Sequence, residues 1–343
     1  MIDGEMVVLD GSQGEGGGQI LRSSLALSMA TGKPFRISGI RAGRKKPGLM
    51  RQHLTAVQAA ARVCSAQVEG DVIGSTDLLF RPGPMIPGEY KFSVGTAGSS
   101  TLVFQTLMPA LLLTGKPFVL TLEGGTHNPA SPCLDFLEKV YLACLKRMGV
   151  EAEITVERRG FYPAGGGKWT VEVMPPTVLR PLEVLERGTF LSQQAKVIWS
   201  KIPAIVPERE RAYLKSRLGL QDGQIRIEEA TDSIGPGNVI VAELHYENIA
   251  EVVSGFGEFG VASETVADAV VQECREYQKH GAPVGQHLAD QLLLPMALGA
   301  GGVFRTLPLT LHSRTNIETI GRFLPRPIEV QTLEGKIVEV RIP

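Results

Sequence analysis

Five glycines surround a single glutamate, Glu15, in the segment DGSQGEGGGQILR at residues 10–22. The apolar residues 6–9 before it predict a buried strand, and residues 21–30 after it predict a helix. Glycines at such a junction let backbone N–H groups at the start of the helix face an anion. A tight turn with positive φ angles is the alternative, but a turn alone does not require three consecutive glycines with an acid and an arginine. We therefore interpret the segment as a pocket for phosphate and metal.

The composition is that of a globular protein. Of the 343 residues, 43% are hydrophobic and 21% are charged, and the length corresponds to about two domains. No apolar run reaches the roughly 18 residues of a membrane span, and the first residues lack the pattern of a signal peptide. We therefore expect a cytoplasmic protein with no membrane partner. The cysteines form no CxxC pair, which favours buried thiols over disulfides or zinc ligands, at Cys64, Cys133, Cys144 and Cys274.

The net charge of −1 conceals a separation of charge along the chain. Residues 1–62 contain nine lysines and arginines but four acids, whereas residues 185–280 contain ten bases and fifteen acids. A polyanionic ligand would be attracted to the first segment and repelled by the second. The charge pattern therefore points to an anion site in the N-terminal part of the chain.

A glycine-rich loop, an apolar helix, the pentapeptide TGKPF and a strand follow one another twice. The pentapeptide stands at residues 31–35 and returns unchanged at residues 114–118, 83 positions later. A weaker third copy has a helix at 288–298, a turn at 299–304 and a strand at 307–311. Repetition of this kind indicates that one supersecondary unit is used three times.

The spacing of the copies indicates an insertion. Phe304 follows Phe118 by 186 residues, which exceeds the first interval by about a hundred residues. The acidic segment 185–280 fills this gap, and its predicted strands and helices are typical of a small α/β domain. We predict an α/β (α+β) fold with a body of three repeated α/β units at 1–184 plus 281–343 and an inserted smaller domain at 185–280.

Each copy continues from its strand through a loop into a second helix. If the copies are equivalent, their loops lie on one side of the body, which would bring together His312, the basic loop 41–46 and the loop of His127. No histidine stands in an HxH or HExxH motif, so a catalytic zinc is not expected. A lone histidine between strand and helix, as His312 is, could act as a nucleophile or a base, or serve only as a cap.

Two further segments suit anions. Residues 41–53, RAGRKKPGLMRQH, gather five fixed positive charges without aromatic residues, which favours phosphate contacts over base stacking, although a solvated loop is the alternative. The glycine-rich residues 159–167 form either a sharp turn or an anion nest. Neither Gly-Lys pair extends into a P-loop, and the GxGxxG of residues 255–260 belongs to no run of βαβ units. Turn glycines explain that last motif better than a dinucleotide site.

Together with His312, these segments resemble the RNA 3′-terminal phosphate cyclases along essentially the whole chain. The resemblance is carried by residues 10–22, 40–57, 95–100, 160–167 and 288–297, and by His312 with Thr315 and Asn316. It implies a body of three α/β units with an inserted domain. It also implies an ATP-dependent reaction in which a histidine takes AMP from ATP and passes it to the RNA 3′-phosphate. The neighbouring 2′-hydroxyl then displaces AMP and leaves a 2′,3′-cyclic phosphate.

The resemblance assigns roles to residues by their position in these motifs. His312 matches the nucleophile, and an imidazole with a pKa of about 6.5 is largely neutral and nucleophilic at pH 7. Glu15 matches a ligand of a divalent cation, Mg²⁺ or Mn²⁺. The positions that match contacts to the RNA phosphate are Arg22, Arg41, Arg44, Gln52 and His53. The positions that match the ATP pocket are Gln105, Pro132, His287, Leu288, Ala289, Asp290 and Gln291. The implied partners are ATP and an RNA with a 3′-phosphate end, and a homodimer is possible.

Two residues depart from the family pattern. His287 stands where related bacterial enzymes carry a tyrosine that stacks on adenine, and Trp169 stands where an aliphatic residue is usual. A family branch without the catalytic histidine serves in ribosome assembly, so a non-catalytic RNA-binding role is the alternative, against which His312 and Glu15 argue. Enolpyruvyl transferases share a related repeated unit, but they use two domains of three units each.

Overall fold

The computed structural model describes residues 5–343. Within that part of the chain, three of the four sheets follow one plan, β-α-β-α-β-β, in which the first two strands pair in parallel. The first unit orders its strands β1-β2-β4-β3. Its elements are β1 (Val7–Asp10), α1 (Gln19–Thr31), β2 (Phe35–Ser38), α2 (Arg51–Val63), β3 (Gln67–Glu69) and β4 (Leu78–Arg81). The predicted mixed α/β class is confirmed.

The second unit repeats this order as β5-β6-β8-β7. Its elements are β5 (Gly88–Ser93), α3 (Ser100–Leu111), β6 (Phe118–Gly124), α4 (Leu134–Phe136), the π-helical segment η1 (Leu137–Tyr141), α5 (Leu142–Arg147), β7 (Glu151–Arg158) and β8 (Gly167–Met174). In both units TGKPF forms the turn from helix to strand, with a φ of 73° at Gly32 and 60° at Gly115. A left-handed residue favours glycine, and the proline that follows cannot continue a helix. The repeated pentapeptide is therefore a repeated helix stop.

The third unit shows the same plan, with the sheet order β15-β16-β14-β9. Its elements are β9 (Leu182–Val184), α8 (Gln286–Leu298), β14 (Gly302–Thr306), α9 (Leu311–Phe323), β15 (Glu329–Thr332), η3 (Glu334–Lys336) and β16 (Val338–Ile342). The strand predicted at 307–311 is wrong, because the strand here is β14. Gly301 and Gly302, with φ of 73° and 130°, turn the chain at once after α8, and a Cβ on Gly302 would overlap the Leu182 backbone of β9. Pro308 in turn cannot donate to a strand ladder.

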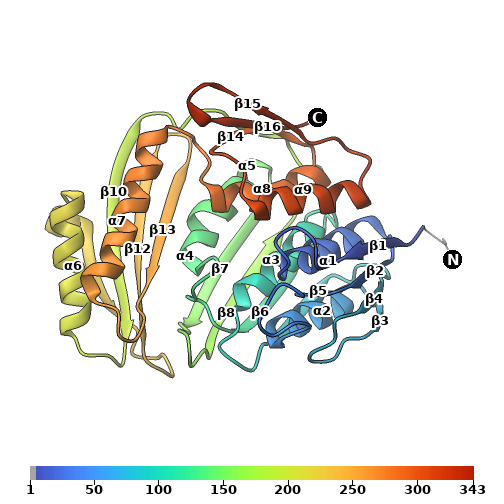
Figure 1. Cartoon of the computed structure of the whole chain (residues 1–343), viewed down its shortest axis with the longest axis horizontal. Helices are drawn as coiled ribbons and strands as arrows, with labels where there is room; N and C mark the ends of the chain where they lie inside the picture. The colour runs from blue at the N-terminus through green and yellow to red at the C-terminus, as the bar shows by residue number, and fades with distance from the viewer. Residues whose placement is uncertain (1–4) are drawn as a thin grey trace.

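A fourth sheet interrupts the third unit between β9 and α8, and in Figure 1 it lies at one end of the molecule with α6 outermost. Its strand order is β11-β10-β12-β13. The elements of this segment are β10 (Phe190–Ser200), α6 (Ile205–Leu218), η2 (Asp222–Gln224), β11 (Ile225–Glu229), β12 (Gly237–Tyr246), β13 (Ala250–Phe256) and α7 (Ser263–His280). Alternate strand residues face opposite ways. One set, with Val197 and Ile240, packs with α6 and α7 in a separate apolar cluster, whereas Ile198, Val239 and Val241 join the main core.

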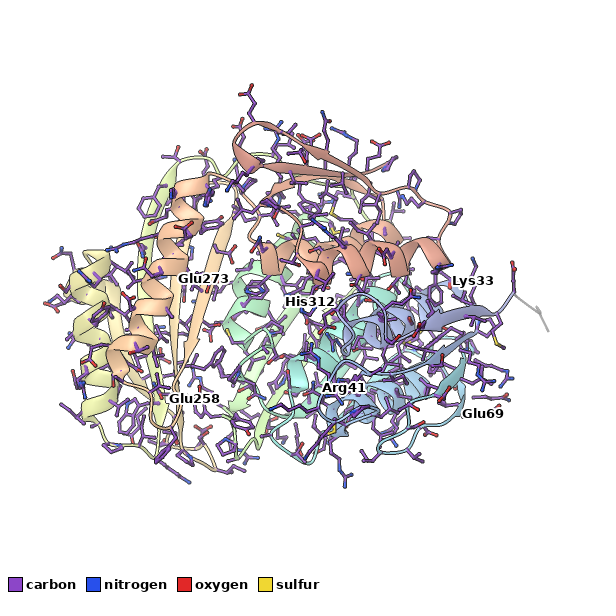
Figure 2. All side chains as sticks on the ribbon, viewed as in Figure 1. Lys33, Arg41, Glu69, Glu258, Glu273 and His312 are labelled. Atoms are coloured by element: carbon purple, nitrogen blue, oxygen red, sulfur yellow. The ribbon has the colours of Figure 1, made fainter. Side chains whose placement is uncertain are left out.

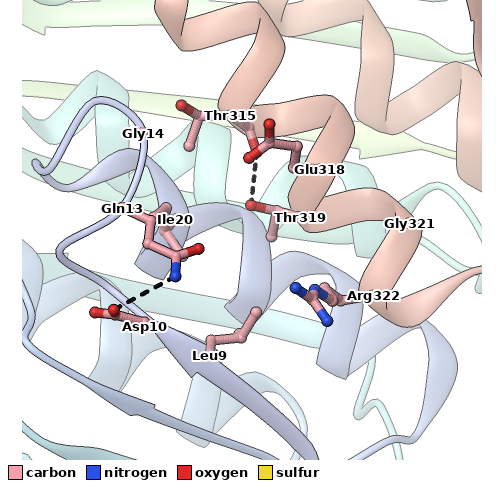
Figure 3. Close-up of a pocket in the computed structure, with 10 residues that line it drawn as sticks. All are labelled: Leu9, Asp10, Gln13, Gly14, Ile20, Thr315, Glu318, Thr319, Gly321 and Arg322. Atoms are coloured by element: carbon pink, nitrogen blue, oxygen red, sulfur yellow. Dashed lines mark hydrogen bonds between the residues drawn. The ribbon is translucent and has the colours of Figure 1, made fainter.

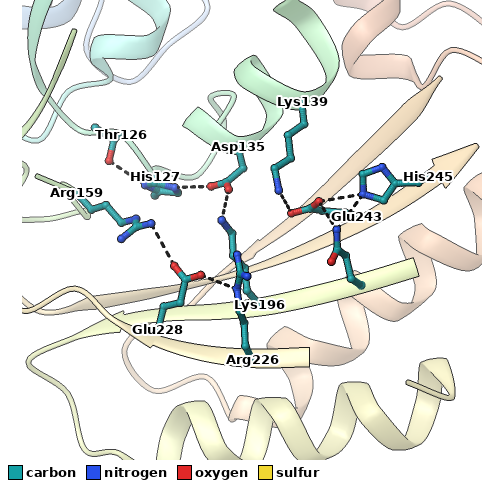
Figure 4. Close-up of polar contacts among 11 residues, drawn as sticks. Thr126, His127, Asp135, Lys139, Arg159, Lys196, Arg226, Glu228, Glu243 and His245 are labelled. Atoms are coloured by element: carbon teal, nitrogen blue, oxygen red, sulfur yellow. Dashed lines mark hydrogen bonds and ion pairs between the residues drawn. The ribbon is translucent and has the colours of Figure 1, made fainter. Parts of the chain in front are cut away.

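Buried polar side chains join this fourth sheet to the second unit (Figure 4). The His127 ring lies 2.8 Å from Thr126 Oγ1 through Nδ1 and 3.0 Å from Asp135 Oδ2 through Nε2, and Lys196 of β10 forms an ion pair with Asp135. Arg159 and Glu228 form a further ion pair at 3.2 Å. The His127 ring is buried and both of its nitrogens are engaged. Both ring nitrogens of His127 therefore serve the junction between the second unit and the fourth sheet.

Helix α1 lies at the centre of the body, where it packs against α3, α8 and α9. Its residues Leu21 and Leu25 are fully buried, so the glycine-rich loop before it is attached to a rigid helix. Trp169, the unusual residue of the β8 strand, is also fully buried, and its indole N–H donates to Ser100 Oγ at 2.9 Å.

The composition led to expectations about the cysteines and about membrane-spanning segments. All four cysteines are free and buried, as expected, and burial raises the pKa of Cys64 to about 11 and that of Cys133 to about 12. Along residues 5–343, no helix combines the length and apolarity needed to cross a membrane.

Candidate functional site

The glycine-rich loop packs against the first turns of α9. Gly14 and Gly16 have φ angles of 59° and 60°, which glycine adopts without steric cost. A Cβ on Gly14 would overlap the Thr315 side chain, and one on Gly17 would overlap the Glu15 carboxylate. The Glu15 backbone N–H donates to Thr315 Oγ1 at 3.1 Å. The glycines therefore let the loop approach α9 and fold the carboxylate back over its own backbone.

A cleft of about 370 Å³ opens beside this contact, between the loop and the outer side of α9 (Figure 3). Gln13 and Gly14 line it from the loop, while Thr319 and Arg322 line it from α9. Thr315 belongs both to this cleft and to the hydrogen bond with Glu15. The loop is thus anchored at Thr315 and open to solvent beside it.

Glu15, Arg44 and His312 meet although they come from three separate segments of the chain. The Glu15 side chain is 8% exposed and forms an ion pair with Arg44, and its Oε1 lies 4.0 Å from His312 Nε2. Glu15 Oε2 is buried and has no hydrogen-bond partner. In Figure 2, His312 and Arg41 lie near the middle of the view, with Glu273 on the side of α7. The structure thus brings the predicted nucleophile and the predicted metal ligand together.

His312 is the second residue of α9 and not part of a loop. Thr310 caps this helix, since its Oγ1 accepts the Ser313 N–H at 3.1 Å, so that α9 begins at Leu311. The His312 side chain is half-exposed. Burial lowers its pKa below 6.5, with Arg22 and Arg44 contributing, whereas Asp290 opposes the change. The imidazole is therefore neutral at pH 7 and accessible, as a nucleophile must be.

The predicted phosphate-binding residues lie near the start of α1, in the basic loop and at the start of α2. Burial lowers the pKa of Arg22 to about 10, and burial together with Arg22 and Arg41 lowers the pKa of His53 to about 3. A Cβ on Gly18 would lie 2.6 Å from His53 Nε2 and 2.7 Å from an Arg22 guanidinium nitrogen. Glycine at this position therefore lets the two side chains converge. Arg22 is half-buried, donates to Gln19 Oε1 at 2.7 Å and is favoured by the charge of Asp290, and a phosphate there would add a charged acceptor.

The other predicted phosphate-binding residues form hydrogen bonds or an ion pair within the protein. They are Arg41, Gln52 and Arg44. Arg41 adopts a φ of 57° and donates to the backbone oxygens of Lys46 at 2.7 Å and Gly48 at 2.8 Å, so its guanidinium holds the loop in shape. Gln52 Oε1 accepts the Ser99 N–H at 3.0 Å. Arg44 is half-exposed and is the loop cation that reaches Glu15.

The positions predicted for the ATP pocket lie on α8, α3 and the loop before α4. Gln105 donates to Gln291, and Asp290 accepts from Asn316 Nδ2 at 3.3 Å through Oδ1 and at 3.0 Å through its backbone oxygen. The Pro132 carbonyl accepts Thr101 Oγ1 at 2.8 Å. Of the remaining predicted positions, His287 is exposed, and Leu288 and Ala289 are buried.

Sequence reasoning did not assign roles to three side chains that hold the site together. Thr315 binds the Glu15 N–H, and Asn316 links α9 to Asp290. Ser23 of α1 donates to Asn316 Oδ1 at 2.7 Å. Thr315 and Asn316 follow His312 by three and four residues, so helical spacing places them near the same side of α9. That spacing could have indicated them, but only once the helix was known to include His312.

A divalent cation fits this site only as a partner of phosphate. Among residues 5–343, no group of three or more histidine, cysteine, aspartate or glutamate side chains could enclose a metal ion. Glu15 offers one buried oxygen without a partner. Mg²⁺ is commonly bound through one or two carboxylates together with substrate phosphates and water. The residues present therefore fit an ion that arrives with a triphosphate.

An accessible neutral histidine, a buried carboxylate and converging arginines on three repeated α/β units define a phosphate-handling α/β enzyme. The chain belongs to the RNA 3′-terminal phosphate cyclase family, whose model matches residues 13–330. The family resemblance drawn from the sequence is therefore confirmed.

Curated proteins named RNA 3′-terminal phosphate cyclase are similar over nearly the whole chain. The protein of Koribacter versatilis is 48% identical over 330 residues, which cover 96% of this chain and 93% of that protein. Those of Pseudomonas fluorescens and Salmonella enteritidis are 46% identical and cover 98% of each chain. A solved structure of EPSP synthase from Acinetobacter baumannii has a TM-score of 0.28 and 10% identity, covers 93% of this chain and 62% of its own, and is too distant to compare in detail.

Proposed function

We propose that this protein uses ATP to convert the 3′-terminal phosphate of an RNA into a 2′,3′-cyclic phosphate, with His312 carrying AMP between the substrates. The observation that carries the proposal is the placement of His312. Its neutral, half-exposed imidazole lies 4.0 Å from buried Glu15 and beside Arg44. Family membership supports the substrate class, since relatives over nearly the whole chain bear the cyclase name.

In the first step, an imidazole nitrogen of His312 attacks the α-phosphorus of ATP. A nitrogen–phosphorus bond forms, the bond from the α-phosphorus to the bridging oxygen breaks, and pyrophosphate leaves. Nucleophilic catalysis of this kind divides one difficult displacement into two easier ones. The lowered pKa of His312 keeps the attacking lone pair available at neutral pH.

In the second step, an oxygen of the RNA 3′-phosphate attacks the same phosphorus and the nitrogen–phosphorus bond breaks, which frees His312 and leaves an RNA–AMP anhydride. In the third step, the 2′-hydroxyl attacks the RNA phosphorus and loses its proton, and AMP departs. Arg22 and His53 converge beside Gly18, where an incoming phosphate would accept from the half-buried Arg22 guanidinium. Glu15 would hold the divalent cation, which offsets the negative charge of the phosphates when it is bound.

We also propose that residues 185–280 form an inserted domain within a body of 1–184 plus 281–343. The separate apolar cluster of β10–β13 with α6 and α7 supports this division. The Arg187 guanidinium supports it as well, because it bonds the entering linker to the Ala282 carbonyl of the leaving one at 2.9 Å.

The decisive experiment follows the fate of AMP. Incubation with ATP labelled at the α-phosphate and Mg²⁺ or Mn²⁺ should leave label on the wild-type protein that is lost in acid and kept in alkali. ATP labelled at the γ-phosphate should leave none. His312→Ala should remove the label, whereas His280→Ala, a surface histidine on α7 paired with Glu276, should retain it.

Added RNA with a 3′-phosphate should discharge the label and acquire a phosphatase-resistant cyclic end, whereas a 3′-hydroxyl RNA should not. Equal labelling of wild type and His312→Ala would contradict the assignment of the nucleophile. RNA binding without any labelling would instead indicate the non-catalytic, ribosome-assembly role.

A further inference from the structure

The fourth sheet takes no part in the proposed chemistry, yet its edge strand touches the helix that carries the predicted ATP-binding positions. Glu251, near the start of edge strand β13, is buried with 6% of its surface exposed. Its carboxyl group lies against Gly285, the residue before the first turn of α8, and a Cβ on Gly285 would overlap Glu251 Oε2. Glycine at this position therefore lets the carboxyl reach the end of the helix.

Helix α8 has no capping group of its own. Gly285 offers no side chain, and the first turn of α8 contains no acidic residue. The first N–H groups of a helix have no partner within it and favour a polar or negative group nearby. Glu251 Oε1 accepts the Val252 N–H at 3.1 Å, whereas Oε2 is buried without a hydrogen-bond partner and is the atom nearest to Gly285. The edge strand thus brings to α8 the polar group that the helix lacks.

The connector 281–285 between α7 and α8 is held at several points. Tyr277 of α7 donates its hydroxyl to the Pro283 carbonyl at 2.7 Å, and Arg187 donates to the Ala282 carbonyl at 2.9 Å. The Arg187 guanidinium also lies 3.8 Å from the centre of the Tyr277 ring. The Val284 N–H also donates to the Arg305 carbonyl of β14 at 3.1 Å, so the fourth sheet and the third unit together hold the start of α8.

One turn further along α8, Asp290 is bonded to Asn316 of α9, the helix that carries His312. The first turns of α8 are thus fixed by β13 at one end and by the nucleophile's helix at the other. We propose that Glu251 is a positioning residue for nucleotide binding, which holds the first turn of α8, with His287 and Asp290, in register with His312. This inference rests on the proposed use of ATP.

The surroundings of Glu251 also shift the pKa of its carboxyl group. Burial raises the pKa of the Glu251 carboxyl to about 8, and Glu273 adds to the rise, whereas the Val252 and Gly285 amides and Arg187 oppose it. The other titratable groups that face it are Cys144 of α5 and Cys274 and Tyr277 of α7. At pH 7 the group is therefore mainly an uncharged acid, which a glutamine can imitate.

Steady-state kinetics on the full-length protein separate positioning from chemistry. Loss of a helix cap costs about 1 kcal/mol, so Glu251→Ala should raise the KM for ATP about fivefold while the rate at saturating ATP changes less than about twofold. Glu251→Gln should restore the KM at pH 7. Between pH 7 and 9 the wild-type KM should change as Glu251 loses its proton, whereas the KM of Glu251→Gln should stay flat over that range.

Glu210→Gln is the matched control, because Glu210 is also a buried carboxyl of the same segment but lies on α6, bonded to Asn238 Nδ2 at 2.7 and 2.8 Å. It should leave the KM for ATP and its pH dependence unchanged. Gly285→Ala should act like Glu251→Ala, and the double variant should be no worse than Glu251→Ala alone, since removal of the carboxyl makes room for the new methyl group. Equal losses in Glu251→Ala and Glu210→Gln would overturn the proposal.

Amide hydrogen exchange tests positioning without any reaction. The N–H groups of residues 286–290 should exchange faster in Glu251→Ala than in wild type or Glu210→Gln. Unchanged exchange there in a folded Glu251→Ala variant overturns the role of Glu251 even if the protein is a cyclase. Faster exchange with no labelling of wild-type His312 would instead leave Glu251 as the cap of α8 and refute the proposed reaction.

Discussion

The buried ion pair between Lys196 and Asp135 allows a quantitative test of how the fourth sheet is held to the body. Both side chains are less than a tenth exposed, and the pair crosses from β10 to α4. Although burial alone would raise it, the His127 ring and the Lys196 ammonium group hold the pKa of Asp135 well below its usual range. Removal of one partner from such a pair leaves a buried charge unpaired.

The structure sets the size of the effect of Lys196→Met. Breaking a buried pair costs about 3–5 kcal/mol, and we expect about 3 kcal/mol because Asp135 keeps its bond to His127. For a chain of 343 residues that corresponds to a fall in Tm of roughly 4 °C. Methionine keeps most of the apolar stem, so the loss reports the charge rather than a cavity.

Thermal and urea unfolding at pH 7 measure this loss. Because the folded pKa of Asp135 is depressed, its contribution is fully present above the unfolded value of 3.8 and is lost only as the pH falls towards the folded value. Lys168→Met is the control, since Lys168 and Glu157 form an exposed pair that should contribute less than about 1 kcal/mol. A double-mutant cycle with Asp135→Asn should show that the two losses do not add. A Lys196→Met protein as stable as the control variant would refute the reasoning.

Three further predictions concern the site. Glu15→Gln should slow metal-dependent labelling by at least about tenfold with little change in Tm, because the buried carboxylate oxygen without a partner is lost. Unchanged metal dependence in this variant would show that Glu15 is not part of the site. The pH profile of labelling should break below 6.5, since burial lowers the pKa of His312 and the reactive neutral form survives to lower pH; a break above 6.5 would contradict this. Gly18→Ala should weaken binding of a 3′-phosphorylated RNA about tenfold, because its Cβ would crowd His53, whereas Gly223→Ala, with open space around it, should not.

The repeats and the fold class could be predicted because their signals are local. A glycine that ends a helix and a proline that prevents its continuation act within five residues, so TGKPF marks the same turn in two units. The third unit lacks that pentapeptide, and its strand was placed too late in the chain. There, Gly301 and Gly302 make the turn, and the reason for its sharpness is β9, which lies more than a hundred residues earlier in the sequence.

The parts of the site that sequence reasoning could not supply depend on contacts between distant segments. No pattern in the chain pairs Glu15 with Thr315, or Asp290 with Asn316, because each pair depends on how α1, α8 and α9 pack. The partners of His127 could not be inferred for the same reason, since Asp135 and Lys196 come together only when β10 packs on the second unit. The chemical type of each residue could be inferred from the sequence, but its partner could not.

The packing of segment 185–280 against the body matters for the geometry of the proposed reaction. A displacement reaction requires the attacking nitrogen and the phosphorus to approach within about 3–3.5 Å, and an error of about 1 Å can cost two orders of magnitude in rate. In the proposed reaction α9 carries His312 and α8 carries the nucleotide-binding positions, and the first turns of α8 contact Asn316 on one side and Glu251 on the other. A shift of β13 would remove one of the supports at the start of α8 and leave the contact of Val284 with β14. Variants at the junction of β10 with Asp135 should therefore affect labelling of His312 as well as stability.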